Sequence, residues 1–502
     1  MTWHLARKEL LANLITMRFS IGTALFLALV VLFTSVLIGD YRQKLERYDE
    51  LVAKNSERLR NQMSYQNLKP DIYKPPEVLS VFSKGVEDNV AKSAQISIDT
   101  VPVPSGAYTA KNPLLSVFPV LDFVLIFKLV ISILIFLFVY DSISGEKEDR
   151  TLALMLSNGI PRYQVLTGKF IGGMITISIP ITIGFLAAGL ILSVSPIVAL
   201  TASEWLRIVL MYIVSLIMVA ALCSIGLFFS SITRQATSTL TFLFFVWILF
   251  VLVVPNSSTY LAARITPVES RRGIDSRTAE FQRELRKKYY EFMRQNSYSD
   301  YYYVQSDETE PGGSYHWYAT KCQVRLEQQL YAFITPLRMD YADKTWLLEK
   351  SSFESLKQQK NLSDMLSLTS PLSVYEILIS GLSRSDAASL ERFYDQAAEY
   401  RRQFIGYLYD KKAFSSIRYF ATVKEEDLFD VKNNEEYSLL RKKYEDQKAL
   451  PLNLEDLPRF RYQPESLADT VKRILPGVGL LFFTGVLFFI CTFVAFIKYD
   501  VR

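Results

Sequence analysis

Apolar residues along the chain gather in six long runs, which are separated by polar segments of very different lengths. A helix needs about 20 consecutive apolar residues to cross the ~30 Å hydrocarbon core of a bilayer. The fifth run falls short of that length unless residues 237–239 and Pro255 are added to it. The runs predict membrane-spanning helices at residues 19–39, 118–140, 170–194, 205–229, 240–254 and 474–497.

Two polar segments, residues 40–117 and 255–473, are long enough to form structures outside the membrane. In the larger segment, stretches such as 269–295 and 386–412 place apolar residues at i, i+3 or i+4, and i+7 among charged ones, which is typical of surface helices. The smaller segment begins as a charged helical stretch, residues 41–60, and then becomes extended and rich in proline. We therefore predict an all-α polytopic membrane protein with a mainly helical domain outside the bilayer.

One further helix is predicted inside the larger segment. Ser370 is a good helix-capping residue, and Pro371 after it suits the first helical position. The run that follows, residues 371–379, is largely apolar. We expect this helix to rest on the outer face of the bilayer.

Basic residues in the short connections indicate the orientation, because Lys and Arg accumulate in cytoplasmic loops. The short loop 195–204 has neither residue type, whereas Arg42, Lys44 and Arg47 lie in a segment too long for the rule to apply. Both termini are therefore predicted to be cytoplasmic. The residues on that side would be Arg7, Lys8, Arg18, Lys147, Arg150, Arg162, Lys169, Arg234, Lys498 and Arg502.

Composition narrows the classes of function. The net charge of +5 over 502 residues gives no sign of a nucleic-acid-binding surface. The 3 cysteines and 2 histidines have no spacing typical of a disulfide framework or a metal site. Nucleotide-binding and hydrolase motifs such as G-x-x-x-x-G-K-[ST] do not occur. We therefore expect no catalytic residues, no metal site and no cofactor of its own.

The loop after the second predicted span, residues 144–162, is the most informative part of the chain. A helix that starts near Ser144 would place Glu146, Glu148 and Asp149 in its first turn, where the helix dipole favours negative charge. The loop is therefore predicted to contain a short helix with an acidic beginning.

This short helix would also have an apolar edge and a defined end. Asn158-Gly159 is a typical helix terminator, and Pro161 prevents simple continuation. The result is an amphipathic rod that a cytoplasmic partner could grip, while the alternative is a solvated turn that only reconnects two spans. The apolar edge consists of Leu152, Met155 and Leu156.

This loop resembles the E-x-E-x-x-T-L…P-x-[SR]…G-K pattern of ABC-2-type permeases, the membrane subunits of one class of ATP-binding-cassette transporter. In that family the pattern forms the coupling helix, which docks onto a separate ATPase subunit. The matching residues are Glu146, Glu148, Thr151, Leu152, Ile160-Pro161-Arg162 and Gly168-Lys169-Phe170.

The N-terminus resembles the amphipathic connecting helix that the same family places along the inner membrane face. One side of this predicted helix is apolar and the other is polar. The apolar side carries Trp3, Leu10, Leu14 and Met17, and the polar side carries His4, Arg7, Lys8 and Asn13.

The resemblance implies a permease of a bacterial inner membrane, with the domain 255–473 placing it in the subset with a large insertion between spans five and six. It implies an exporter that works with a second permease chain, identical or homologous, and with two ATPase subunits that use ATP-Mg. The remaining units would be 1–39, 40–117, 118–254 and 474–502. The residues implied in ATPase coupling are Glu146, Glu148, Asp149, Arg150, Thr151 and Leu152.

Two other hypotheses remain open at the level of the sequence. The chain and its ATPase could be a mechanical transmitter that acts on an envelope protein through the outer domain. Alternatively, the chain could be a receptor or scaffold without an ATPase. Neither the cargo nor its direction is encoded in a pattern that we recognise.

A few residues outside the loop are candidates for binding. Lys128 in the second span and Asp122, six residues nearer the outside, could line a translocation path, or Lys128 could form a structural pair or extend to the interface. The aromatic residues Tyr298, 301–303 and 315–317 could hold a ligand or simply pack, and Cys322 could be a buried thiol or pair between chains.

Overall fold

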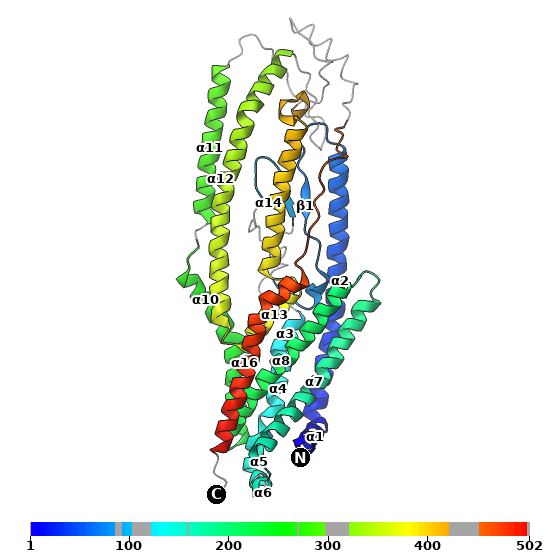
Figure 1. Ribbon diagram of the computed structural model, residues 1–502, viewed down its shortest axis with the longest axis vertical. Coiled ribbons are helices and arrows are strands. Elements are labelled where there is room, and N and C mark those ends of the chain that lie inside the picture. The colour runs from blue at the N-terminus through cyan, green and yellow to red at the C-terminus, as the bar shows by residue number, and fades with distance from the viewer. Residues whose placement is uncertain are drawn as a thin grey trace.

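The computed structural model describes residues 2–85, 93–102, 122–157, 160–268, 271–296, 321–420 and 451–498, without the side chains of residues 271 and 321–324. The molecule is elongated, with a bundle of apolar helices at one end and long helices that extend from it at the other (Figure 1). The elements are α1 (Thr2–Leu14), α2 (Met17–Arg60), β1 (Asp71–Tyr73), η1 (Val78–Val81), β2 (Ser93–Gln95), α3 (Phe123–Ile126), η3 (Phe127–Ile131), α4 (Ser132–Val139), α5 (Asp141–Glu148), α6 (Thr151–Ser157), α7 (Arg162–Val194), α8 (Ala202–Ile232), α9 (Ala236–Ile248), η4 (Leu249–Val253), α10 (Val254–Ile265), α11 (Arg271–Gln295), α12 (Lys321–Ser367), α13 (Pro371–Leu382), α14 (Ala387–Asp410), η5 (Ala413–Ser415), η6 (Ile417–Tyr419) and α16 (Leu467–Ile497).

Within the described residues, six helices are long and apolar enough to cross a membrane. They confirm the predicted all-α polytopic class and correspond one by one to the six apolar runs. These helices are Met17–Arg60, Phe123–Glu148, Arg162–Val194, Ala202–Ile232, Ala236–Ile265 and Leu467–Ile497.

The first of these helices, α2, is much longer than a bilayer is thick. Its 44 residues rise by about 66 Å at 1.5 Å per residue, roughly twice the ~30 Å hydrocarbon core. The predicted first span and the charged stretch 41–60 are therefore one continuous helix, whose polar half stands outside the bundle beside the other long helices (Figure 1).

The fifth span reaches its full length because it continues through Pro255. A π-helical turn, η4, directly precedes the proline, and the N–H of Val254 donates to the carbonyl of Leu249, five residues back. A proline ring normally collides with the carbonyl four residues before it, and a widened turn relieves that collision. The short fifth run of the sequence is thus part of a 30-residue helix.

The second span also contains a π-helical turn, η3, in which the N–H of Ser132 donates to the carbonyl of Phe127. The hydroxyl of Ser132 donates to the carbonyl of Lys128 and accepts a hydrogen bond of 2.8 Å from the indole N–H of Trp247 in α9. This turn therefore ties the second span to the fifth. The helix begins at Phe123, and residues 118–121 of the predicted span lie outside the described residues.

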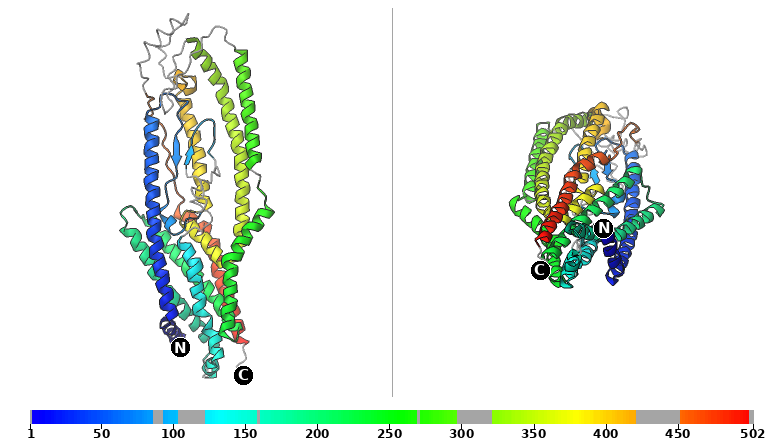
Figure 2. Two further views of the ribbon diagram at one scale, coloured as in Figure 1. Left: turned by 180° about the vertical axis from the view of Figure 1, so that it is seen from behind. Right: turned by 60° about the horizontal axis from the view of Figure 1, so that its bottom comes forward.

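Among the described residues, the part outside the bundle is mainly helical, as predicted, and it contains one small sheet. Strands β1 and β2 pair antiparallel, with Ile72 opposite Ala94. Ile72 and Ile96 join Phe393, Phe404 and other apolar side chains of α14 in a core that is separate from the core of the bundle. Helices α11 and α12 pack along each other as a hairpin next to this core (Figures 1 and 2).

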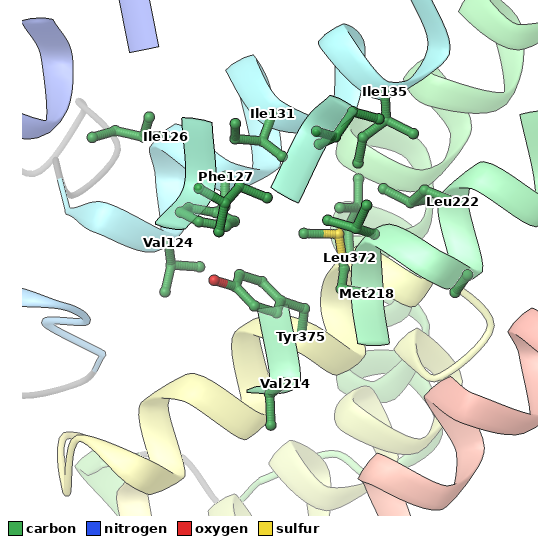
Figure 3. Close-up of a cluster of buried hydrophobic side chains, with 14 of the residues drawn as sticks. Val124, Ile126, Phe127, Ile131, Ile135, Val214, Met218, Leu222, Leu372 and Tyr375 are labelled. Atoms are coloured by element: carbon green, nitrogen blue, oxygen red, sulfur yellow. The ribbon is translucent and has the colours of Figure 1, made fainter. Parts of the chain in front are cut away.

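Helix α13 does not lie on the bilayer face, so that prediction is wrong. Ser370 caps it as predicted, accepting from the N–H of Ser373, and Pro371 occupies the first turn. However, α13 is apolar on most of its surface and packs against α8 and α16 inside the bundle. Figure 3 shows the side chain of Tyr375 between residues of the second and fourth spans. Its ring stacks on that of Phe127 at 5.5 Å between centroids.

Candidate coupling site

The region predicted to receive the ATPase lies at one tip of the molecule. Helix α6 is at the end of the bundle that also holds both chain termini (Figure 1). The loop 144–162 and the termini therefore lie on the same side, as the distribution of basic residues predicted.

The helix in this loop does not start near Ser144, contrary to the prediction. Helix α5 continues the second span to Glu148. Helix α5 is followed by Arg150, whose backbone is in the left-handed conformation at φ 60° and therefore does not continue the helix. Helix α6 then begins at Thr151. The acidic residues consequently occupy the last turn of a helix, where the dipole disfavours negative charge, so that other groups must stabilise them.

Glu146 is stabilised by two lysines from other helices. Its Oε1 lies 2.9 Å from Nζ of Lys169 in α7 and 3.7 Å from Nζ of Lys8 in α1. Lys169 also contacts Glu9 at 2.8 Å, and its side chain is only 3% exposed. The Lys169 of the predicted G-K pattern therefore joins the coupling loop to the third span and to the N-terminal helix.

The next residue, Lys147, points in a different direction. Its ammonium donates to the carbonyl oxygens of Ser231 and Thr233, the latter at 3.0 Å, where α8 ends. The last carbonyls of a helix have no partner within the helix, and a cation there is also favoured by the dipole. Nearby, the Ser230 hydroxyl accepts from the N–H groups of Ile143 and Ser144 at 3.0 Å. The second span is thus tied to the end of the fourth.

Glu148 makes the third connection. Its Oε2 accepts a hydrogen bond of 3.0 Å from the backbone N–H of Ala236, the first residue of α9. A carboxylate at a helix N-terminus is stabilised by the dipole and by the unpaired N–H groups. Three consecutive residues, Glu146, Lys147 and Glu148, therefore bind the ends of three different spans. We call them the coupling triplet.

Beyond the triplet, the tip divides into an inward and an outward face. Leu152 is 1% exposed, and Met155 and Leu156 pack partly buried against the bundle core, which confirms the predicted apolar edge. Asp149, Arg150 and Thr151 are exposed, and Leu154 is 65% exposed. Of the predicted coupling residues, Asp149, Arg150 and Thr151 thus face away from the chain, whereas Glu146 and Leu152 face into it.

The N-terminal helix α1 packs along α7. A Cβ atom at Gly168 would lie 2.7 Å from Cβ of Leu5, and one at Gly172 would lie 2.6 Å from Cβ of Glu9, so the two helices touch because both positions lack a side chain. Trp3 and Met17 of the predicted apolar side remain exposed. This arrangement suits a helix that lies against lipid beside the coupling triplet.

The two predicted path residues are held by different partners. Nζ of Lys128, in the π turn η3, lies 2.6 Å from Oε2 of Glu376 in α13. Asp122 caps the start of α3 by accepting from the N–H of Leu125 at 2.9 Å, and it also accepts from the N–H of Lys84 at 3.2 Å. Lys128 therefore forms an ion pair with α13, and its partner was not predicted.

A buried arginine in the fourth span was missed by the sequence reasoning. Arg207 is fully buried, and its guanidinium donates to the carbonyl of Leu382 at 3.1 Å, the carbonyl of Glu465 at 3.0 Å and the hydroxyl of Thr470 at 3.0 Å. It thus joins α8 to the end of α13 and the start of α16. A basic residue within a predicted span was the signal that could have identified it.

Some predictions fall where the structure gives no account. Tyr298, residues 301–303 and residues 315–317 lie outside the described residues, as does the side chain of Cys322. Among the residues that are described, no group of three or more His, Cys, Asp or Glu side chains could hold a metal ion.

Comparison with known proteins assigns the chain to a protein family. A family model described as "ABC-2 family transporter protein" matches residues 3–423. No curated protein matches the chain. The match extends from α1 through the coupling triplet and α13 into the outer helices.

Proposed function

Because the chain belongs to the ABC-2 family of transporter proteins, we propose that it is the permease of an exporter that is driven by a separate ATPase subunit. Membership in the family makes it the permease subunit of an ABC transporter. The coupling triplet is the observation that supports the finer proposal. It connects one exposed tip to three spans, as a part that receives force from outside must do.

The proposed mechanism starts at the exposed tip. Two ATPase subunits would bind ATP-Mg, close, and displace the tips of two permease chains, which are identical or homologous. Because Glu146, Lys147 and Glu148 hold the ends of the third, fourth and fifth spans, a displaced tip would move these spans together. The chain itself would bind no cofactor and catalyse no reaction.

The orientation follows from the same proposal. The tip would lie in the cytoplasm, together with both termini, and the α11–α14 region would lie outside the inner membrane of a bacterium. ATP can shift the permease between two states only if the ATPase contacts differ between those states. Asp149, Arg150, Thr151 and Leu154 are the exposed groups that would make such contacts.

A test of this proposal replaces two exposed residues of the tip with glutamate. We expect wild-type chain, tagged and extracted in mild detergent, to co-purify with an ATPase, and the Arg150→Glu/Leu154→Glu variant to lose it. Leu347→Glu, which alters a similarly exposed leucine in α12, is the matched control. Co-purification that survives the tip variant, or the absence of any ATPase with the wild type, would contradict the proposal and favour a receptor or scaffold.

One observation favours a second candidate, a mechanical transmitter. The helix α2 runs without interruption from the bundle into the outer part, so that movement of the first span also moves the outer part. Vesicles that contain the permease and its ATPase would separate the two candidates. ATP-dependent accumulation of a cargo supports export, whereas ATP hydrolysis that only changes the outer helices supports transmission to an envelope protein.

A further inference from the structure

A cavity of about 550 Å³ lies in the outer part, where three distant segments meet. Helix α11 forms one wall and α12 the opposite wall, while Gln66, after α2, and Phe420, after η6, close it from other sides. The volume is in the range of small-molecule sites. Neither the coupling triplet nor the path residues line this cavity.

The walls of this cavity carry many aromatic rings. Tyr289 and Tyr290 come from α11, and Tyr331 comes from α12. The ring of Tyr331 stacks on that of Phe420 at 5.5 Å between centroids, and its hydroxyl donates to Gln66 at 3.1 Å. These contacts hold two of the rings in a fixed orientation before a ligand arrives.

One carboxylate, Glu327, lines the cavity together with these rings. It is partly buried on α12, one turn before Tyr331. None of the described residues gives it a hydrogen bond or an ion pair. Burial raises the pKa of Glu327, and no cation among the described residues opposes that effect. A carboxylate in such surroundings gains stability when a ligand brings positive charge to it.

Two arginines also line the cavity, but neither neutralises Glu327. Arg338 lies 3.9 Å from Asp99, which compensates its charge. Arg286 is exposed to solvent on α11. Water therefore screens Arg286, and Glu327 remains the charged group that is surrounded by rings.

We infer that this cavity binds a small organic ammonium ion, with Glu327 pairing its charge and the rings of Tyr289, Tyr290, Tyr331 and Phe420 contacting its alkyl groups. Aromatic faces attract cations electrostatically, and the attraction is strongest when the cation is desolvated. The site goes beyond the proposed export function and does not depend on it.

The ligand must be soluble rather than the head group of a membrane lipid. Helix α12 runs from Glu327 to Ser367, where it reaches the bundle beside α13. The 40 residue steps from position 327 to position 367 (367 − 327 = 40) correspond to about 60 Å of helix at 1.5 Å per residue. A lipid that remains in the bilayer does not span that distance.

Calorimetry on the full chain tests this inference. The chain would be placed in nanodiscs of phosphatidylglycerol, because choline lipids would compete with the probe. Choline and its uncharged carbon analogue, 3,3-dimethylbutan-1-ol, are the two probes. We expect choline to bind and the analogue to bind at least about tenfold more weakly, since the shape is the same and only the charge differs.

Variants locate the binding to this cavity. Glu327→Gln keeps the shape of the side chain, and we expect it to weaken choline binding about tenfold, whereas Glu354→Gln, on the exposed surface of the same helix, should have no effect. Tyr290→Ala removes a ring that is 63% exposed and should also weaken binding, with Tyr409→Ala, at a ring that is 55% exposed, as its control. Equal binding of both probes, no binding of choline, or unchanged binding in Glu327→Gln would overturn the inference.

Discussion

The hydroxyl of Ser370 donates a 3.0 Å hydrogen bond to the carbonyl oxygen of Phe250. In the π-helical turn η4 a carbonyl accepts a hydrogen bond from the N–H five residues later. The residue five positions after Phe250 is Pro255, whose nitrogen has no hydrogen to donate. Ser370 thus caps its own helix and also satisfies a carbonyl of the fifth span that the proline leaves without a backbone donor. This pair of contacts fixes the start of α13 against the fifth span.

We expect Ser370→Ala to lower the free energy of unfolding by about 1–3 kcal/mol, because it leaves a partly buried carbonyl without this donor. Thermal unfolding of the detergent-solubilised chain measures this effect. Ser355→Ala, which removes an exposed hydroxyl that bonds only within α12, should change it little.

A double-variant cycle makes this prediction specific. Pro255→Ala restores an N–H in the fifth span, so that Ser370→Ala should cost less in that background. If the two substitutions were additive, the proposed link between the proline and the serine would be wrong.

Lys147 should be needed for coupling because it holds the second span to the end of the fourth. We expect Lys147→Met to lower transport in vesicles at least tenfold and to reduce stability by about 1–2 kcal/mol, the scale of a cation at a helix C-terminus. Lys287→Met, at an exposed lysine of α11, serves as control. Transport at the wild-type level in Lys147→Met would show that this contact is not part of the force path.

Glu146 and Lys169 should depend on each other. Removing one partner of a buried ion pair typically costs about 3–5 kcal/mol, because the other charge remains without compensation. We therefore expect Glu146→Ala to reduce the amount of folded chain, as judged by gel filtration, and not merely to uncouple it. Lys169→Met alone should also be destabilising, since it leaves Glu9 without this partner as well.

The double variant Glu146→Met/Lys169→Met discriminates between a structural and a docking role for Glu146. If the role is structural, the double variant should recover part of the folded chain that Glu146→Ala loses, because the uncompensated Lys169 charge is gone while Glu9 still lacks its partner. Full transport in Glu146→Ala/Glu148→Ala would contradict both the structural role and any role in ATPase contact.

Arg150 allows the backbone and side-chain roles of one position to be separated. A non-glycine residue in the left-handed region costs about 1–2 kcal/mol, and glycine removes that cost. We expect Arg150→Gly to raise the thermal midpoint slightly while lowering ATPase-dependent transport, because the exposed guanidinium is lost. A variant with both higher stability and undiminished transport would remove Arg150 from the ATPase contact surface.

In the coupling loop the apolar edge could be predicted from the sequence, whereas the polar contacts could not. Its apolar edge, Leu152 with Met155 and Leu156, was predicted correctly because helical periodicity is a local property. The start of the helix was wrong, because the tie of the 143–144 backbone to Ser230, 86 and 87 positions away, continues the second span past Ser144. No pattern within one loop reveals a partner at such a distance along the chain.

The six spans, the mainly helical outer part and the family resemblance of the coupling loop could all be predicted from the amino-acid sequence alone. Each of these features depends on residues that are close together in the sequence. A span, for example, requires about 20 consecutive apolar residues. The packed structure was needed to show that Lys147 and Glu148 reach the ends of spans 86 and 88 positions away, and that α13 enters the bundle. Charge pairs and caps act over a few ångströms in space, so they exist only once distant helices have packed together.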